Sequence, residues 1–292
     1  MSVVEVLKKV LRIQIVANRT VNDLFAGQYK SVFRGRGMEF DEVRLYQPGD
    51  DIRSIDWNVT ARTGECFIKR YSEERELTVL FVVDISASGV FGSIRRSKLD
   101  VVVELSALLM FSALKNNDKV GLITFCDDVI DFMPPRKGKS HVLRLIRHLV
   151  DVDPVARPTQ LHRPLEFLNR VQKRRAVVFY ASDFLGVLPL RLLGITHRRH
   201  DLTAVTVSDP RERELPKVGF LTLRDAETGE VTEVDTSNAN LRQTFAQRAA
   251  DRERTLTERL RRLGIDQLSV DAQSDYALML RRFFAMRERR FR

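Results

Sequence analysis

One stretch constrains the fold more than any other: residues 78–89, with the sequence TVLFVVDISASG. Its apolar run at residues 79–83 stops abruptly at Asp84, and two serines, Ser86 and Ser88, follow. An apolar run that ends in polar and small residues predicts a parallel strand that is covered on both faces and leads into a loop. Ligands of open α/β sheets bind just beyond the carboxyl ends of such strands. The sequence therefore predicts a carboxylate and two hydroxyls at a binding position.

Asp84, Ser86 and Ser88 are spaced i, i+2, i+4, so their side chains point the same way in an extended or loosely turning segment. All three offer oxygen, and oxygen ligands with a single carboxylate among them suit Mg²⁺ better than Ca²⁺. A purely structural alternative is that these side chains only cap the helix that follows the strand. The pattern D-x-S-x-S at the end of a buried strand resembles the metal-ion-dependent adhesion site of von Willebrand factor A-like domains.

This resemblance implies two further ligands, a threonine from a second loop and an aspartate after a later strand. Thr159 lies in a proline-bounded loop with the sequence ARPTQLHRPLEFL, and Asp183 ends the predicted strand AVVFYASD. Both stand in the order along the chain that the resemblance requires. The implied cofactor is a divalent cation, Mg²⁺ or Mn²⁺. The implied metal ligands are Asp84, Ser86, Ser88, Thr159 and Asp183.

Downstream of this segment, apolar runs that predict strands alternate with periodic patterns that predict helices. Strands are expected at 119–126, 176–182 and 202–207, a short antiparallel strand at 129–133, and helices at 97–115, 140–150, 161–171 and 189–199. Such alternation implies mostly parallel pairing with right-handed crossovers. The predicted fold class is α/β, a Rossmann-like, doubly wound, mostly parallel sheet of the von Willebrand factor A-like type, with an irregular strand-rich N-terminal segment.

The N-terminal segment carries a long motif, GxxFxxxRxYxxGDDxRxIDW, at residues 37–57. The motif resembles the signature of the bacterial domain-of-unknown-function fifty-eight family, which places it directly ahead of a von Willebrand factor A-like domain. That resemblance covers roughly residues 37–235 and implies a metal-dependent adaptor that works with MoxR-type AAA+ ATPases. The charged residues of the motif either satisfy one another and the loop backbone or form a recognition surface. Its candidate residues are Arg44, Tyr46, Asp50, Asp51, Arg53, Asp56 and Trp57.

The sequence divides into three predicted parts. Residues 1–76 hold an amphipathic helix at 2–17 and the motif segment, residues 77–210 the von Willebrand factor A-like domain, and residues 211–292 a hairpin around DAETGE, a long charged helix and a basic terminal helix. Of the 292 residues, 43% are hydrophobic and 30% are charged, which is typical of globular proteins. Neither a signal peptide nor an apolar run of about 18 residues is found, so a cytoplasmic location is expected.

The last twelve residues, RRFFAMRERRFR, carry six arginines and one glutamate within a chain of net charge +10. An arginine-rich end with interleaved Phe283, Phe284 and Phe291 predicts either a surface for nucleic acid or anionic lipid, or a helix whose phenylalanines pack on the body. We favour the packed helix, because charge alone identifies no partner. Nucleic acid is therefore the less favoured partner.

A metal-dependent hydrolase is the other alternative, because Ser86 and Ser88 lie in a strand-to-helix turn. The nucleophile pattern GxSxG is absent, and metal-assisted phosphatases bring more carboxylates. With Asp84 and Asp183 as the only clear acidic ligands, a bound metal keeps electrophilic character, which favours capture of a partner's carboxylate over activation of water. We therefore expect a non-enzymatic, metal-dependent adaptor whose protein partner is a MoxR-type AAA+ ATPase or its client.

Overall fold

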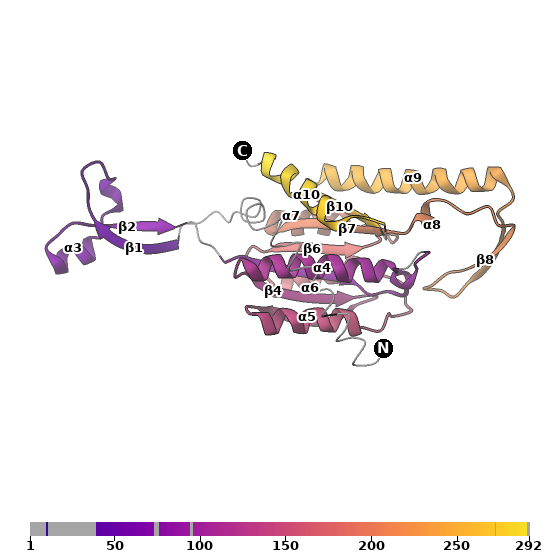
Figure 1. Cartoon of the computed structure of the whole chain (residues 1–292), viewed down its shortest axis with the longest axis horizontal. Helices are drawn as coiled ribbons and strands as arrows, with labels where there is room; N and C mark the ends of the chain where they lie inside the picture. The colour runs from indigo at the N-terminus through magenta and orange to yellow at the C-terminus, as the bar shows by residue number, and fades with distance from the viewer. Residues whose placement is uncertain (1–9, 11–38, 73–75, 94–95, 272, 291–292) are drawn as a thin grey trace. The chain divides into compact units, whose positions relative to one another are not determined.

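The computed structural model describes Val10 and residues 39–72, 76–93, 96–271 and 273–290 (Figure 1). The chain separates into two compact units, Phe33–Leu77 and the remainder. The helix expected at residues 2–17 lies outside the described residues apart from Val10, which is helical and buried.

The smaller unit is built on an antiparallel pair of strands. Asp56 caps the helix between them by accepting hydrogen bonds from two backbone N–H groups, and Gly64 ends that helix at a φ of 80°. The expected irregular, strand-containing segment is thus confirmed. Its elements are β1 (Glu39–Leu45), η1 (Ile52–Ser54), α3 (Trp57–Thr63) and β2 (Phe67–Ser72).

The larger unit is organised around a six-stranded sheet in the order β10-β7-β6-β3-β4-β5. All neighbouring strands pair in parallel except β4 and β5, which are antiparallel. This confirms the predicted mostly parallel sheet, including its antiparallel edge. The strands are β3 (Thr78–Asp84), β4 (Lys119–Phe125), β5 (Val129–Arg136), β6 (Val177–Ser182), β7 (Asp201–Ser208) and β10 (Asp266–Asp271).

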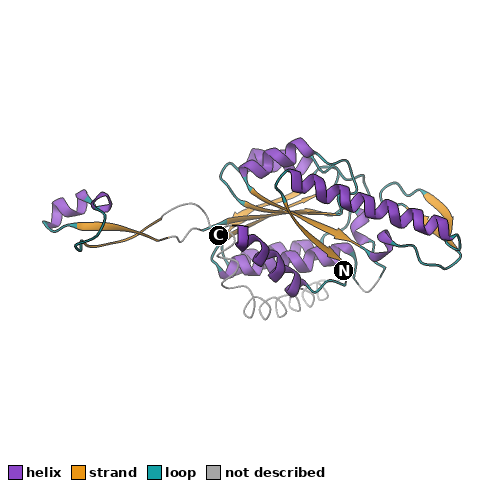
Figure 2. Cartoon of the chain, turned by 90° about the horizontal axis from the view of Figure 1, so that it is seen from above, coloured by secondary structure: helices purple, strands orange, loops and turns teal. Residues whose placement is uncertain are grey.

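Helices cover both faces of this sheet, as a doubly wound fold requires (Figure 2). Ser97 and Asp100 form a capping box at the start of α4, which fixes where that helix begins. Helix α4 packs beside α5, and α6 packs beside α7. The helical segments are η2 (Ala87–Val90), α4 (Lys98–Lys115), α5 (Lys139–Asp151), α6 (Arg163–Val171), α7 (Leu190–Arg199), α8 (Pro210–Arg213), α9 (Ala239–Arg262) and α10 (Tyr276–Arg290).

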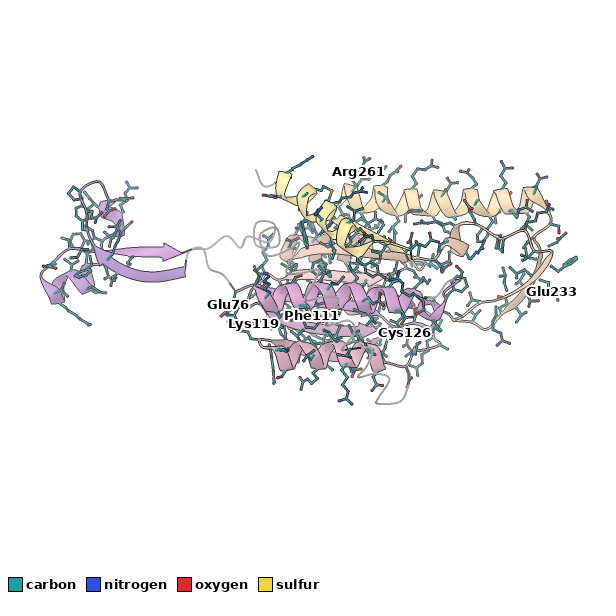
Figure 3. The ribbon with its side chains drawn as sticks, viewed as in Figure 1. Glu76, Phe111, Lys119, Cys126, Glu233 and Arg261 are labelled. Atoms are coloured by element: carbon teal, nitrogen blue, oxygen red, sulfur yellow. The ribbon has the colours of Figure 1, made fainter. Side chains whose placement is uncertain are left out.

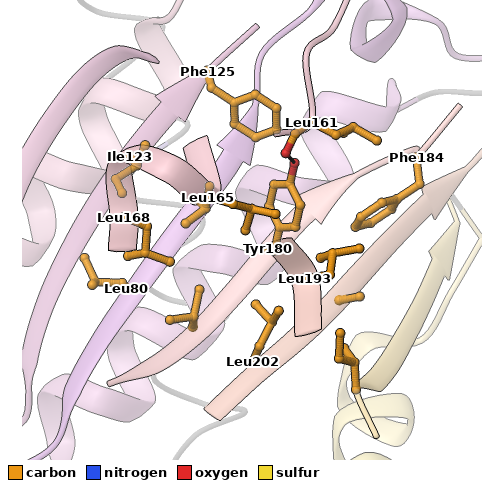
Figure 4. Packing of buried hydrophobic residues seen from close by; sticks show 14 of the residues in the cluster. Leu80, Ile123, Phe125, Leu161, Leu165, Leu168, Tyr180, Phe184, Leu193 and Leu202 are labelled. Carbon is orange, nitrogen blue, oxygen red and sulfur yellow. Dashed lines mark hydrogen bonds between the residues drawn. The ribbon is translucent and has the colours of Figure 1, made fainter. Parts of the chain in front are cut away.

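Strand β3 lies in the middle of the sheet and is buried from Val79 to Asp84. Its alternate residues Leu80 and Val82 belong to one apolar cluster with residues of β4, β6, α6 and α7 (Figure 4). Each fully buried aliphatic side chain of this kind stabilises the fold by roughly 1.5–3 kcal/mol. The fully buried Tyr180 donates a hydrogen bond of 2.8 Å to the carbonyl of Leu161, so the core also holds the loop that precedes α6.

The C-terminal part of the chain completes the larger unit. A hairpin, β8 (Phe220–Arg224) and β9 (Val231–Asp235), leads into α9, and β10 then pairs in parallel with β7. Phe283 and Phe284 of α10 are buried, which supports the packed-helix alternative for the described part of the arginine-rich end. Phe291 lies outside the described residues. No helix in the described part of the chain is long and apolar enough to cross a membrane.

Candidate functional site

Four of the five predicted metal ligands meet at the carboxyl edge of the sheet. Asp84 ends β3 and Asp183 follows β6, and these strands are parallel neighbours, so their carboxyl ends lie side by side. The Ser88 hydroxyl donates a hydrogen bond of 2.8 Å to Oδ2 of Asp183, 95 residues away. The Oγ atoms of Ser86 and Ser88 are 3.0 Å apart. The D-x-S-x-S segment and the later aspartate therefore form one polar cluster.

The structural alternative, that these side chains only cap the next helix, does not describe what the serines do. Ser86 precedes η2 without capping it through its side chain, and α4 is capped by Ser97. The serine hydroxyls interact instead with each other and with Asp183. Asp84 accepts hydrogen bonds from the N–H of Ser86 (3.0 Å) and from the hydroxyl of Ser182 (2.7 Å).

Asp84 is a buried carboxylate whose two hydrogen bonds come from uncharged donors, a backbone N–H and a hydroxyl. Burial, followed by the negative charge of Asp183, raises its pKa from 3.8 to about 6, while hydrogen bonds from Ser86 and Ser182 oppose the rise. Only 8% of the residue is exposed. A carboxylate whose charged form is disfavoured in this way is stabilised by any cation that binds next to it.

Lys98 is a component of the cluster that the sequence reasoning missed. Its ammonium donates to Oδ2 of Asp183 (2.7 Å) and to Oε1 of Glu212 (2.6 Å), and only 2% of its side chain is exposed. Burial lowers the pKa of Lys98, but Asp183 and Glu212 outweigh burial and the net shift is upward. A sequence signal existed, because a lysine in the first turn of a helix is disfavoured by the helix dipole unless it has acidic partners.

The cluster fits a small divalent cation on two counts. It surrounds a cavity of about 10 Å³, close to the space of a single water-sized sphere, lined by Asp84, Ser86, Ser88, Lys98 and Asp183 together with neighbouring apolar residues. Octahedral Mg²⁺ holds its ligands at about 2.1 Å, so adjacent ligand oxygens lie about 3.0 Å apart, the separation found between the two serine hydroxyls.

The donor set is rich in hydroxyls and poor in carboxylates. In the described ranges, no group of three or more His, Cys, Asp or Glu side chains is arranged to hold a metal. A cation bound between the two aspartates would therefore need the hydroxyls of Ser86 and Ser88 as further ligands. Lys98 lines the same cavity, so an entering cation shares Asp183 with the ammonium or displaces it.

Thr159, the fifth predicted ligand, binds a different group. Its hydroxyl donates to Oε1 of Glu227 (3.0 Å) and its N–H donates to Oε2 of the same carboxylate (3.2 Å). The loop that carries Thr159 is nevertheless held against the D-x-S-x-S segment by backbone hydrogen bonds. Ala87 donates its N–H to the carbonyl of Val155, and Val155 donates its N–H to the carbonyl of Ile85. Coordination of a metal by Thr159 stays a prediction.

A cleft of about 560 Å³ adjoins the polar cluster and shares Asp183 with it. It lies between the segment that follows β6, the end of β7, and helix α9. Leu185 and Val187 line it and are 58% and 93% exposed. Its α8 and α9 side carries charges of both signs, from Arg213, Arg252 and Arg259 and from Glu212, Asp251 and Glu253. The cleft thus offers apolar and charged contacts beside the candidate metal site.

The motif residues of the smaller unit divide into two groups. Arg44 and Asp50 form a two-pronged ion pair at 2.9 and 2.7 Å, while Asp51 caps η1 and Asp56 caps α3. These four side chains support the loops around them, as the structural alternative predicts.

The other motif residues contribute less to the loop structure. Tyr46 donates its backbone N–H to Cys66, whereas the side chains of Arg53 and Trp57 are exposed, Trp57 by 65%. A recognition role of these exposed side chains stays a prediction.

Comparisons with known proteins place the chain in a family. Uncharacterized proteins of Mycobacterium bovis and Mycobacterium tuberculosis are 33% identical over 283 residues, which cover 95% of this chain and 88% of theirs. The uncharacterized protein YeaD of Bacillus subtilis is 28% identical over 120 residues, which cover 39% of this chain and 28% of YeaD.

Solved structures with similar folds share little sequence with this chain. A conserved hypothetical protein BatB from Bacteroides thetaiotaomicron is 18% identical, with a TM-score of 0.47 over 73% of this chain and 99% of that one. The VWA domain of SpRpn10 is 12% identical, with a TM-score of 0.38 over 70% of this chain and 94% of that one. Residues 42–255 match the family model described as "Protein of unknown function DUF58", and the chain belongs to that family.

Proposed function

We propose that this protein is a non-enzymatic adaptor that binds a partner protein through a divalent cation held at the carboxyl edge of its sheet. The observation that carries the proposal is the hydrogen bond from Ser88 to Asp183, which joins the D-x-S-x-S segment to a residue 95 positions later. Asp84, Ser86, Ser88 and Asp183 hold Mg²⁺ or Mn²⁺ in this account. The cation supplies an open coordination position, and the chain supplies the oxygens that orient it.

The ligand that such a cation accepts is a carboxylate. Two aspartates balance the charge of a magnesium ion, but neutral hydroxyls donate little electron density, so the ion stays electrophilic at its open coordination position and binds an aspartate or glutamate side chain of a partner. The adjoining cleft then contacts the partner residues on either side of that carboxylate through Leu185, Val187 and the arginines of α9. Specificity resides in the cleft and affinity for the acidic residue resides in the metal.

The partner we propose is a MoxR-type AAA+ ATPase or the client of such an ATPase, as the family resemblance implies. The cleanest test uses the purified ATPase of the same genome without nucleotide, immobilised on a biosensor at constant Mg²⁺. Keeping Mg²⁺ constant matters, because ATPases of this class bind the metal with nucleotide themselves.

The test variant is the double change Ser86→Ala and Ser88→Ala, which removes two candidate ligands and leaves both aspartates and Lys98 in place. The wild-type chain is expected to bind and the double variant to lose at least about tenfold in affinity, or about 1.4 kcal/mol. A matched control is Ser140→Ala, at an exposed serine of α5. Equal binding by the wild type and the double variant would contradict the proposal.

A further inference from the structure

Glu227 differs from its neighbours in the hairpin between β8 and β9, because it contacts Thr159 and is half-buried. Glu227 is the only residue from Thr222 to Glu233 that is not exposed. Both of its carboxylate oxygens accept hydrogen bonds from Thr159, one from the hydroxyl and one from the backbone N–H. Two donors from a single residue form a small cradle for a carboxylate.

The turn that carries Glu227 is built to present it. Asp225 accepts hydrogen bonds from the N–H groups of Glu227 and Thr228, and Asp225 and Glu230 are joined by a backbone hydrogen bond. Gly229 takes a φ of 74°, which a residue with a side chain adopts only at a cost. These contacts within the tip favour a tight turn that presents the Glu227 side chain.

The arms of the hairpin, in contrast, are held weakly. Phe220 and Val231 are 81% and 52% exposed, and an isolated two-stranded hairpin is marginally stable in water. Its base is fixed, because the buried Thr236 hydroxyl donates to the carbonyl of Gly219 and accepts from the N–H of Val218. The hairpin thus joins the body at its base and at its tip (Figure 1).

The tip also approaches the candidate metal site. The loop that carries Thr159 is joined to the D-x-S-x-S segment through Val155 and Ala87. Gln160 donates its N–H to the carbonyl of Cys126, at the carboxyl end of β4. The Glu227 carboxylate therefore lies where the second loop meets the ends of β3 and β4.

We propose that Glu227 is an internal ligand, which occupies the position that an acidic residue of a partner takes when it binds. This inference rests on the proposed function and adds two features to it. The first is the way in which the partner presents its glutamate or aspartate, on a tight turn. The second is competition, since the hairpin tip must leave Thr159 before the partner's carboxylate enters.

The probe for this inference is a fluorescent peptide of residues 221–234, cyclised through added terminal cysteines so that it keeps the turn. Its binding to the full chain is measured by fluorescence anisotropy in Mg²⁺ and in chelator. A tethered group acts at an effective concentration of the order of millimolar, so removing the tethered competitor in Glu227→Ala is expected to tighten peptide binding by about tenfold. Adding Thr159→Val to that variant is expected to abolish the gain.

The matched control is Glu233→Ala, on the same hairpin, whose side chain is exposed (Figure 3). It is expected to bind the peptide as the wild type does. A peptide with alanine in place of its own Glu227 is expected not to bind. The inference is overturned if Glu227→Ala binds the peptide no better than the wild type, or if the alanine peptide binds equally well.

Hydrogen exchange gives a second readout that needs no ligand. Amides of the tip, residues 225–230, are expected to exchange faster in Glu227→Ala than in Glu233→Ala, because only the first change releases the tip. Equal exchange in the two variants would show that the contact does not hold the tip and would overturn the inference.

The two proposals fail in different ways. If the wild type binds Mg²⁺ while Glu227→Ala gains no affinity for the peptide, the internal ligand is refuted and the metal site stands. If no variant binds Mg²⁺ but Glu227→Ala binds the peptide in chelator, the metal site is refuted and the cradle at Thr159 stands.

Discussion

Replacing Asp84 by asparagine is expected to stabilise the metal-free protein at neutral pH. Burial and Asp183 raise the pKa of Asp84 from 3.8 to about 6. A rise of roughly 2 pKa units corresponds to about 3 kcal/mol by which the ionised carboxylate disfavours the folded state. Asparagine removes that charge but loses the acceptor that the Ser182 hydroxyl uses, at about 1 kcal/mol. The free energy of unfolding should therefore increase by about 1–2 kcal/mol.

The pH dependence has a defined sign. Because the folded pKa of Asp84 is raised, the folded state binds more protons than the unfolded chain between about pH 4 and about pH 6. Asp84 therefore lowers the free energy of unfolding as pH rises through that window. Asp84→Asn should remove this part of the pH dependence of stability. Urea unfolding in chelator, followed by circular dichroism, measures both effects. Circular dichroism is needed because the only tryptophan, Trp57, lies in the smaller unit.

Asp183→Asn is the matched control, since it changes the other aspartate of the same cluster and is expected to have the opposite effect. Asp183 accepts hydrogen bonds from Ser88 and from the buried Lys98, so its loss leaves the ammonium with Glu212 alone. The expected cost is about 1–3 kcal/mol. The electrostatic argument is refuted if Asp84→Asn is less stable than the wild type at neutral pH. It is also refuted if the variant keeps the full pH dependence of the wild type's stability.

Two further changes test other contacts of the larger unit. Lys98→Met should lower the free energy of unfolding in chelator by about 3 kcal/mol, because it leaves Asp183 buried without its cation. Millimolar Mg²⁺ should restore part of that lost stability, measured as a rise in the melting temperature of the variant. Arg287→Met should cost about 3–5 kcal/mol in urea unfolding, because the 3% exposed guanidinium pairs with Asp201 and Asp266 and joins α10 to the sheet. The exposed Arg289→Met should change stability by less than about 0.5 kcal/mol, and an equal loss in both arginine variants would contradict this assignment.

The larger unit was predictable because its sequence is locally consistent. The apolar run before Asp84 and the run that ends at Ser182 predict buried strands, and the structure places them as parallel neighbours. The adjacency of Asp84 and Asp183 then follows from the geometry of parallel sheets, since carboxyl ends share one edge. The pairing of the late strand β10 with β7 brings the C-terminal part into the main sheet.

The missed parts of the site are contacts between segments far apart in sequence. Lys98 reaches Asp183 and Glu212 across 85 and 114 residues, and nothing local to α4 indicates those partners. Thr159 was expected beside the metal, but the hairpin places Glu227 against it from 68 residues away. Local patterns determine which side chains face an edge of the sheet, whereas the path of a distant hairpin determines which of them are already bonded.

The most direct measurement is a calorimetric titration of the wild-type chain with Mg²⁺ and Mn²⁺, alongside the double variant Ser86→Ala and Ser88→Ala. We expect a single saturable site in the wild type that is absent from the double variant. The melting temperature should also rise with metal in the wild type alone. If the wild type shows no heat of binding and no thermal shift at millimolar metal, or if the double variant binds equally well, the cation is not held by this cluster.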